Sequence, residues 1–229
     1  MTTALGIATI PEREHGLARV LDSLLPQVDT AYVYLDKYSR VPSFLNKPNI
    51  KVYHSEVCGD YGCPGKFVGA MEHTGYYVTV DDDIAYPADY VSTLRDLVMK
   101  SDDEVCAGVH GILLNDVVSN YYKDRTIFHF KKSLSSDSFV HLLGTGTLCF
   151  NTKNIAVSLD WMHYKELSDI VVAMELEKKG KRRVCAARPA AWLTPFKEDS
   201  PANTLYRRGL RDPGEATDLI NSIKWSSVS

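Results

Sequence analysis

The sequence predicts an α/β fold in which a mostly parallel central sheet is flanked by helices within a single domain. In the first hundred residues, short apolar runs typical of buried strands alternate with segments whose apolar residues recur at helical spacing. The 229 residues are 45% hydrophobic and 24% charged, which is typical of one large globular domain. Three consecutive acidic residues follow one expected strand and draw attention to a functional site.

The first half of the chain has the more regular pattern. We expect strands at residues 4–10, 31–36, 50–55 and 76–80. Helices are expected at 14–27, 66–73 and about 87–99. Strands that alternate with helices pair in parallel, so their carboxyl ends share the sheet edge at which ligands bind.

The second half is less regular and predicts a small antiparallel element. Strands are expected at 104–111, twice within 126–143 around a Ser-rich turn, and at 182–187. A glycine turn opens the segment "GTGTLCF" at 144–150. Helices are expected at 166–180 and, within a polar tail, near 216–224.

Composition and cysteine usage indicate the compartment. The net charge of −3 gives no general attraction to nucleic acid or to an anionic membrane. No apolar segment approaches the length of about 20 residues that a membrane span requires, and the apolar start is too short for a signal peptide. None of the five cysteines forms a C-x-x-C pair, so we expect reduced thiols in a soluble, cytoplasmic protein.

The acidic triplet Asp81, Asp82 and Asp83 ends the strand expected at 76–80. Adjacent carboxylates repel one another and lose solvation at the end of a buried strand. Strand alternation predicts that Asp81 and Asp83 project together while Asp82 faces away. Two carboxylates at the ligand edge of a sheet suit a hard divalent cation, Mn²⁺ or Mg²⁺.

A structural alternative for the triplet is a helix cap. Asp residues commonly cap helices, and Pro87 would mark the start of the helix that follows. Under this interpretation Asp82 or Asp89 serves only as the cap.

Several segments together resemble the GT-A glycosyltransferases, which move a sugar from a nucleotide-sugar to an acceptor. The block "DDDIAYPADYV" resembles their D-x-D motif, while "IATIPERE" and "YVYLD" resemble the first two strands of the family 2 enzymes. "GDYGCPGKFVGA", "HLLGTGTLCFNT", "LSDIVVAMELEKKG" and "RPAAWL" resemble, in order, the diphosphate loop, the glycine-rich segment behind the acceptor site, the helix with the catalytic acid and the strand after it.

The resemblance covers most of residues 4–194 and implies a GT-A, Rossmann-like domain at 1–194. Its halves would be a nucleotide-binding part at 1–100 and an acceptor and catalytic part at 101–194, with 195–229 as a tail. The resemblance implies donor-binding residues at Thr9, Pro11, Arg13, Asp36, Lys66, Asp81, Asp82, Gly144, Thr145 and Gly146. It further implies metal ligands at Asp83, Asp81 and His163, a catalytic Asp169, and acceptor contacts at Trp192 and Arg188.

The chemistry of sugar transfer gives these residues roles. A cation on Asp83 and Asp81 would neutralise the departing diphosphate. Arg13 and Lys66 would bind phosphate, unless they are solvated surface charges. Asp169 would take the proton of the acceptor hydroxyl, which implies inversion at the sugar carbon.

Other residue types leave alternatives open. Ser168 and Asp169 could simply cap a helix, with Glu166 then the fallback base. "GTGT" lacks the Lys and the spacing of a P-loop; its backbone N–H groups could contact substrate, or its glycines could only permit a turn. His110, His141 and His163 are more often satisfied structural histidines than ligands, and a lone Trp such as Trp192 is most often core.

The acceptor is less defined than the donor. We expect a UDP-sugar donor and a glycan precursor as acceptor, with a hydroxymethylated DNA base as the second possibility. The basic clusters at 178–183 and 206–211 could contact a polyanion, although cations also collect at helix C-termini. The alternatives are a nucleotidyltransferase, disfavoured because "TIPERE" lacks the expected glycines, and a non-catalytic nucleotide-sugar-binding module.

Overall fold

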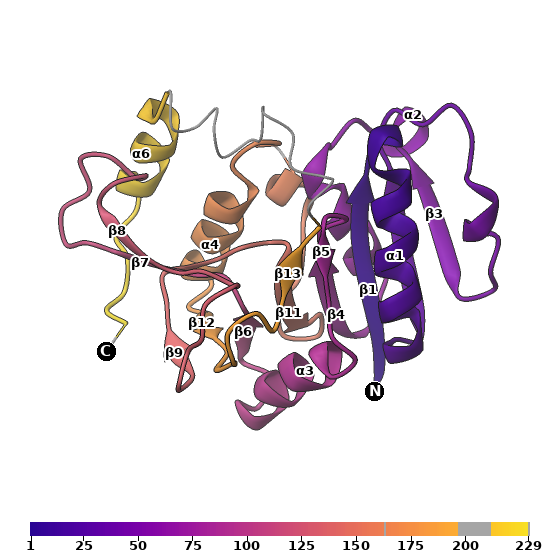
Figure 1. Cartoon of the computed structure of the whole chain (residues 1–229). Coiled ribbons are helices and arrows are strands. Elements are labelled where there is room, and N and C mark those ends of the chain that lie inside the picture. The colour runs from indigo at the N-terminus through magenta and orange to yellow at the C-terminus, as the bar shows by residue number, and fades with distance from the viewer. Residues whose placement is uncertain (163, 197–211, 229) are drawn as a thin grey trace.

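A computed structural model describes residues 1–162, 164–196 and 212–228. The fold is α/β, as predicted, with helices on both faces of an eight-stranded mixed sheet in the order β3-β2-β1-β4-β11-β6-β12-β9. Its strands are β1 (Thr2–Thr9), β2 (Thr30–Leu35), β3 (Ile50–His54), β4 (Gly75–Val80), β6 (Val105–Gly108), β9 (Ser138–Phe139), β11 (Thr147–Asn151) and β12 (Arg182–Cys185). In Figure 1, β3 lies at one end of the molecule and β8 and α6 at the other.

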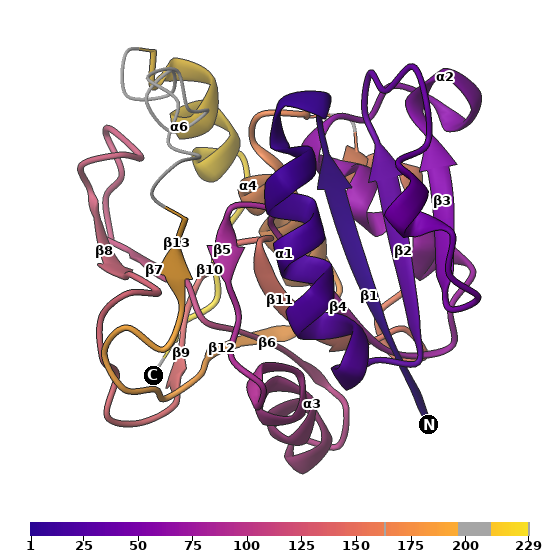
Figure 2. The same cartoon turned by 45° about the vertical axis from the view of Figure 1, so that its right-hand side comes forward.

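The sheet is not parallel throughout. β3, β2, β1 and β4 are parallel neighbours, as expected for the first half, and Figure 2 shows the first three side by side and pointing the same way. β6 and β12 are also parallel to each other. β11 is antiparallel to both β4 and β6, and β9 is antiparallel to β12.

Helices cover both faces because the strands bury side chains on both. The α-helices are α1 (Glu14–Leu24), α2 (Ser55–Cys58), α3 (Tyr90–Lys100), α4 (Ser168–Lys178) and α6 (Gly214–Asn221). The 3-10 helices are η1 (Pro11–Arg13), η2 (Leu25–Gln27), η3 (Ser43–Leu45), η4 (Cys63–Met71) and η5 (Leu159–Met162). Leu5 and Ile7 of β1 pack with α1 and α3, whereas Ala4 packs in the core that includes η4, η5 and α4.

The second half contains the expected antiparallel element, but with a different pairing. A three-stranded sheet has the order β10-β7-β8, formed by β10 (Leu142–Leu143), β7 (Gly111–Leu114) and β8 (Arg125–Phe128). The single strand expected at 104–111 is wrong, because the chain turns after Gly108 and begins β7 at Gly111. β8 pairs with β7 rather than across the Ser-rich turn, and β9 joins the edge of the main sheet.

A small sheet formed by β5 (Ile84–Ala85) and β13 (Thr194–Pro195) is not among the expected elements. In this two-stranded sheet, β5 directly follows the acidic triplet. α6 confirms a helix in the tail. No helix within the described residues is long and apolar enough to cross a membrane, and all five cysteines are free thiols.

The short helix expected at 66–73 is present as the 3-10 helix η4, which begins earlier, at Cys63. Gly65 and Gly69 on η4 lie directly on tyrosine rings of β2: a Cβ atom at Gly65 would be 2.3 Å from Tyr34, and one at Gly69 would be 2.1 Å from Tyr32. Only glycine permits so close an approach. The two glycines therefore bring η4, and Lys66 with it, against the sheet.

We expect Gly69→Ala to destabilise the protein by about 1–3 kcal/mol, because the new methyl group would overlap the Tyr32 ring. Chemical denaturation of the purified variant measures this. Gly214→Ala is the matched control: its Cβ would lie 3.5 Å from the nearest atom, at the start of α6, so stability should be unchanged or slightly raised. Equal losses in the two variants would contradict the close packing of η4.

Candidate active site

The predicted residues gather at the carboxyl ends of the parallel strands. From β1 the chain proceeds to β2 and β3 on one side, and then returns to form β4 on the other side of β1. In open α/β sheets, ligands bind where the strand order reverses in this way. Thr9 and Arg13 follow β1 at this point, and the acidic triplet follows β4.

The triplet lies in a turn, because β4 ends at Val80. Strand alternation therefore does not apply, and the prediction that Asp82 faces away from Asp83 is wrong. Nη1 of Arg13 contacts both, at 2.8 Å from Asp82 Oδ1 and 3.1 Å from Asp83 Oδ2. Asp82 is buried behind this contact, so it positions Arg13 instead of facing a donor.

The helix-cap interpretation of the triplet is also wrong. α3 begins at Tyr90, and its N-cap residue Asp89 makes no side-chain capping bond. The carboxylate of Asp89 instead accepts a hydrogen bond from Nε1 of Trp192 at 3.1 Å. After the triplet the chain is held by β13, and the N–H of Phe196 donates to the carbonyl of Asp83 at 2.8 Å.

Lys66 is an internal cation. Its side chain is 1% exposed and forms an ion pair with Asp81. Burial alone would lower the pKa of Lys66, but the charge of Asp81 outweighs it and raises the pKa. The alternative of a solvated surface charge is therefore wrong. The free phosphate-binding cation that the resemblance implies is likewise not observed, because the ammonium group is already engaged.

Asp81 is held on its other side by the glycine-rich segment. A Cβ atom at Gly146 would lie 1.9 Å from Asp81 Oδ2, so the carboxylate rests on the bare backbone there. The hydroxyl of Tyr86 accepts from the N–H of Asp81 at 2.9 Å and donates to the carbonyl of Gly146 at 2.7 Å. Sequence reasoning missed Tyr86, whose only signal is its place in the "IAYP" that follows the triplet.

Asp83 is the least compensated carboxylate of the three. Its side chain is 31% exposed, and burial together with the charge of Asp81 raises its pKa to about 6, although Arg13 opposes the shift. A cation bound here would relieve this repulsion. Asp81 and Asp83 thus fit Mg²⁺ or Mn²⁺ as a carboxylate pair that leaves positions for phosphate and water.

A complete metal cage is not observed. Within 1–162, 164–196 and 212–228, no group of three or more His, Cys, Asp or Glu side chains could hold a metal. The predicted ligand His163 lies outside the described residues. The two carboxylates would therefore share the cation with the oxygens of a bound substrate.

Asp36 follows β2 and presents an unsatisfied acceptor. The side chain is buried, and its Oδ1 has no hydrogen-bond partner in the structure. Its own N–H donates to the carbonyl of Thr9 at 2.9 Å, which ties the ends of β1 and β2 together. Burying a carboxylate oxygen without a donor is costly, so this atom suits an N–H group of a ligand.

Pro11 is exposed and begins η1, the turn that directs Arg13 to the triplet.

Asp169 lies in the first turn of α4, and its carboxylate is turned to the glycine-rich segment. Both the N–H and the hydroxyl of Thr145 donate to Asp169 Oδ1, each at 2.8 Å. The alternative of a cap is wrong, because the N-cap of α4 is Leu167 and no side chain caps the helix. Burial and Asp81 raise the pKa of Asp169, while Thr145 and Lys66 oppose the shift. The fallback residue Glu166 is exposed.

In "GTGT", the backbone N–H groups of Gly144 and Thr145 form hydrogen bonds within the protein. The N–H of Gly144 donates to the carbonyl of His110 at 2.8 Å, and that of Thr145 is bound to Asp169. The prediction that these N–H groups contact a donor is therefore not supported for either residue. The glycine at 146 is required by the close approach of Asp81.

Both predicted acceptor contacts, Arg188 and Trp192, already have partners within the protein. The guanidinium of Arg188 is buried and donates to main-chain carbonyls of Phe128, His129, Lys132 and Ala186. These carbonyl oxygens accept hydrogen bonds from Nε and from both Nη atoms, so the role of Arg188 is structural. The Trp192 ring packs 5.7 Å from that of Tyr90 at the edge of the core, as the structural alternative predicted.

The histidines divide between structure and site. Nδ1 of His141 accepts from the N–H of Leu114 at 3.0 Å, a structural contact. His110 lies beside Gly144 at the same edge as the triplet, and burial together with neighbouring cations lowers its pKa to about 4.

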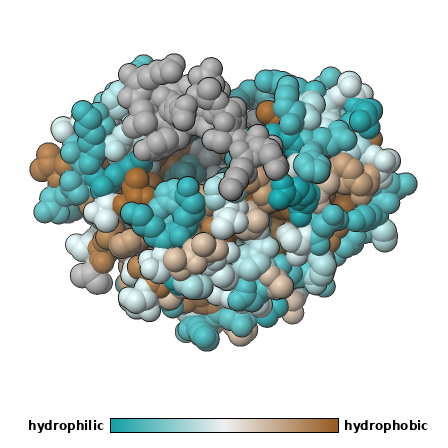
Figure 3. All heavy atoms as spheres, in the orientation of Figure 1, coloured by the Kyte–Doolittle hydropathy of each residue, from teal (hydrophilic) through white to brown (hydrophobic). Residues whose placement is uncertain are grey.

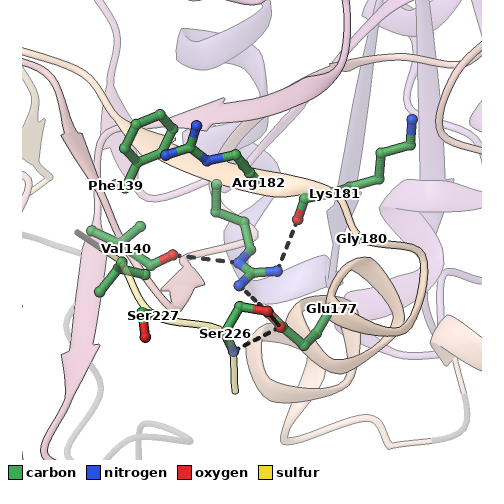
Figure 4. Close-up of a pocket in the computed structure, with 10 residues that line it drawn as sticks. Phe139, Val140, Glu177, Gly180, Lys181, Arg182, Ser226 and Ser227 are labelled. Atoms are coloured by element: carbon green, nitrogen blue, oxygen red, sulfur yellow. Dashed lines mark hydrogen bonds and ion pairs between the residues drawn. The ribbon is translucent and has the colours of Figure 1, made fainter. Parts of the chain in front are cut away.

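The basic cluster at 178–183 is largely neutralised within the chain. Lys178 pairs with Glu175, Lys181 with Glu104 and Arg183 with Glu177. Arg183 and Glu177 line a surface pocket, and Figure 4 shows Ser226 beside the Glu177 carboxylate that its N–H group binds. The cluster at 206–211 lies outside the described residues. A polyanion-binding surface is thus not supported by 178–183.

Neither a comparison with protein-family models nor a comparison with curated proteins gives a match for this chain. The candidate function therefore depends on the chemistry of the site.

Lys66→Met is expected to destabilise the protein by about 3 kcal/mol, because it leaves the charge of Asp81 without its partner beside Asp83. Chemical denaturation at pH 7.5 measures the loss. In the control Lys51→Met, which breaks the exposed pair with Glu72, the loss should stay below about 1 kcal/mol. Adding Asp81→Asn to Lys66→Met should restore part of the stability; a further loss would contradict the pairing.

The raised pKa of Asp83 gives a pH-dependent prediction. Because the folded protein holds this proton more tightly than the unfolded chain, ionisation of Asp83 lowers stability as pH rises from about 4 through 6. Asn cannot ionise, so the Tm of Asp83→Asn relative to wild type should increase between pH 4 and pH 7.5. Asp60→Asn should show the opposite slope, since Lys165 lowers the pKa of Asp60. Parallel slopes would contradict the assignment.

Proposed function

We propose that this chain is a GT-A glycosyltransferase that moves a sugar from a nucleotide-sugar to an acceptor hydroxyl with inversion. One observation carries the proposal: two carboxylate centres with different environments meet at the strand-order reversal. The triplet is held by Arg13 and Lys66, and Asp169 is held separately by Thr145. The charge of Asp81 contributes to the raised pKa of Asp169, and this interaction supports one continuous site.

The donor would bind across the ends of β2, β1 and β4. The unsatisfied Oδ1 of Asp36 suits an N–H group of the nucleobase, with UDP-sugars as the first donors to test. Arg13 is 24% exposed and contacts Asp82 and Asp83 through Nη1, so a diphosphate beside the triplet would bind through other N–H groups of the guanidinium. Mg²⁺ or Mn²⁺ on Asp81 and Asp83 would neutralise the negative charge of the leaving diphosphate.

Asp169 would act as the base. Its raised pKa suits a group that must accept a proton near neutral pH. The acceptor oxygen forms a bond to the anomeric carbon, the bond from that carbon to the diphosphate oxygen breaks, and the hydroxyl proton passes to Asp169. The bond electrons leave with the diphosphate, so the balance requires no further reactant. Oδ1 is fixed by Thr145, which orients the carboxylate for this role.

The acceptor and the compartment are parts of the same proposal. A glycan precursor is the first acceptor class, and a hydroxymethylated DNA base is the second. The free thiols of all five cysteines are consistent with a reducing, cytoplasmic location.

The test is a panel of nucleotide-sugars, each with and without Mn²⁺, read by thermal stabilisation and by slow donor hydrolysis. We expect a metal-dependent rise in Tm for one donor class, lost in Asp83→Ala and retained in the exposed-carboxylate control Asp96→Ala. Asp169→Asn should still bind donor but lose transfer by about 100-fold or more, because only the base is removed.

The outcomes separate the alternatives. Donor binding without transfer to any glycan or DNA acceptor would favour a non-catalytic binding module. No stabilisation by any donor, or stabilisation indifferent to Asp83, would overturn the proposal.

A further inference from the structure

Arg125 is a half-buried cation without an anionic partner. It is the first residue of β8, and its guanidinium carbon lies 4.2 Å from the ring centre of Tyr121 and 5.0 Å from that of Tyr122. Its Nε is buried and has no hydrogen-bond partner among the described residues. Within the part of the chain that the structure describes, no carboxylate forms an ion pair with it. An unsatisfied guanidinium donor in such a place is costly unless a ligand completes it.

Four other arginines show by comparison what Arg125 lacks. Arg13 and Arg183 contact carboxylates, and Arg188 is surrounded by main-chain carbonyls. Arg182 resembles Arg125 in lying on an aromatic ring, 3.3 Å from the centre of Phe139, but it is exposed to solvent. Arg125 therefore combines burial with an unoccupied donor, a combination these four residues do not share.

The surroundings of Arg125 are aromatic and positive. The antiparallel register places Gly111 opposite Phe128, so His110 and His129 are neighbours just beyond the pair, with ring centres 5.1 Å apart. Arg125 lies opposite Leu114, at the other end of the β7–β8 pair from these two histidines. Burial lowers the pKa of both imidazoles, and nearby cations lower it further: Arg125 and Arg188 for His110, and Lys131, Lys132 and Arg188 for His129.

The surroundings of Arg125 adjoin Asp169, the proposed base. Tyr121 packs in the same core cluster as Ile170, the residue after Asp169, and the charge of Asp169 adds to burial in raising the pKa of Tyr121. His110 lies against Gly144, and Thr145 binds Asp169. Asp36 follows β2 and the triplet follows β4, whereas Thr145, which binds Asp169, precedes β11, the neighbour of β4. Arg125 belongs to the separate sheet β10-β7-β8.

We propose that Arg125 binds an oxyanion, a phosphate or a carboxylate, and that the group belongs to an acceptor lying over the β7–β8 face beside Asp169. The planar guanidinium donates to such groups in a fixed geometry, and the imidazoles of His110 and His129 offer further donors at the other end of the β7–β8 pair. The anion site follows from Arg125 and its neighbours alone. Its assignment to the acceptor rests on the proposed function.

Titration with inorganic phosphate and, separately, with acetate tests the site at constant ionic strength. The readouts are the NMR signals of the Arg125 Nε–H group, assigned by its loss in Arg125→Gln, and of the His110 and His129 rings. We expect saturable shifts of all three in the wild type with at least one of the two anions, and that anion identifies the chemical class. In Arg125→Gln the apparent affinity read from the histidines should fall by about tenfold or more.

Two variants make the result specific. Arg182→Gln removes an exposed arginine that also lies on an aromatic ring, and it should leave the titration unchanged. Arg13→Gln removes the cation at the triplet and should also leave it unchanged, which excludes binding at the donor edge. An unmoved Arg125 signal with both anions, or equal affinities in wild type and Arg125→Gln, would overturn the inference. Anion binding that persists when every nucleotide-sugar fails would overturn only the proposed function.

Discussion

The ion pair between Lys66 and Asp81 connects the parts from which the site is built. Lys66 comes from η4, which two glycines hold against tyrosines of β2, and Asp81 comes from the end of β4. The opposite side of the Asp81 carboxylate rests on Gly146, one residue from the threonine that fixes Asp169. A change in the position of this pair would therefore shift the donor edge and the proposed base together.

Figure 3 shows polar and apolar residues interspersed over one face of the protein, so function is not indicated there by a single large patch.

Charge balance explains how three adjacent carboxylates are tolerated. Arg13 forms ion pairs with Asp82 and Asp83, and Lys66 forms one with Asp81, so two cations contact three carboxylates. Negative charge that the two cations leave unbalanced adds to burial in raising the pKa of Asp83. The proposed Mg²⁺ or Mn²⁺ would offset this remaining charge.

Local patterns predicted much of this, and long-range contacts explain the rest. The strand–helix alternation of the first half depends on periodicities within short windows, so its parallel sheet was predictable. β7 was not, because its partners are distant in sequence: it pairs with β8 and β10, and Gly111 packs closely against Cys185. The gathering of Asp36, the triplet and Asp169 followed from their places at strand ends and at a helix start. The burial of Lys66 and the hydrogen bonds from Arg188 to main-chain carbonyls could not be predicted. Residue type alone does not show whether a cation has an internal partner or binds a ligand.

The pairing of β13 with β5 has a consequence for the order in which the protein is made. Ile84 and Ala85 follow the triplet directly, yet their strand partners are Thr194 and Pro195, and the N–H that binds the carbonyl of Asp83 belongs to Phe196. Arg19 of α1 lies over the Phe196 ring, which closes the contact with the first helix. During synthesis the ribosome releases the acidic turn long before its partner strand exists. The turn is thus completed late, and a nascent chain that stops short of residue 194 carries the carboxylates without the strand that secures them.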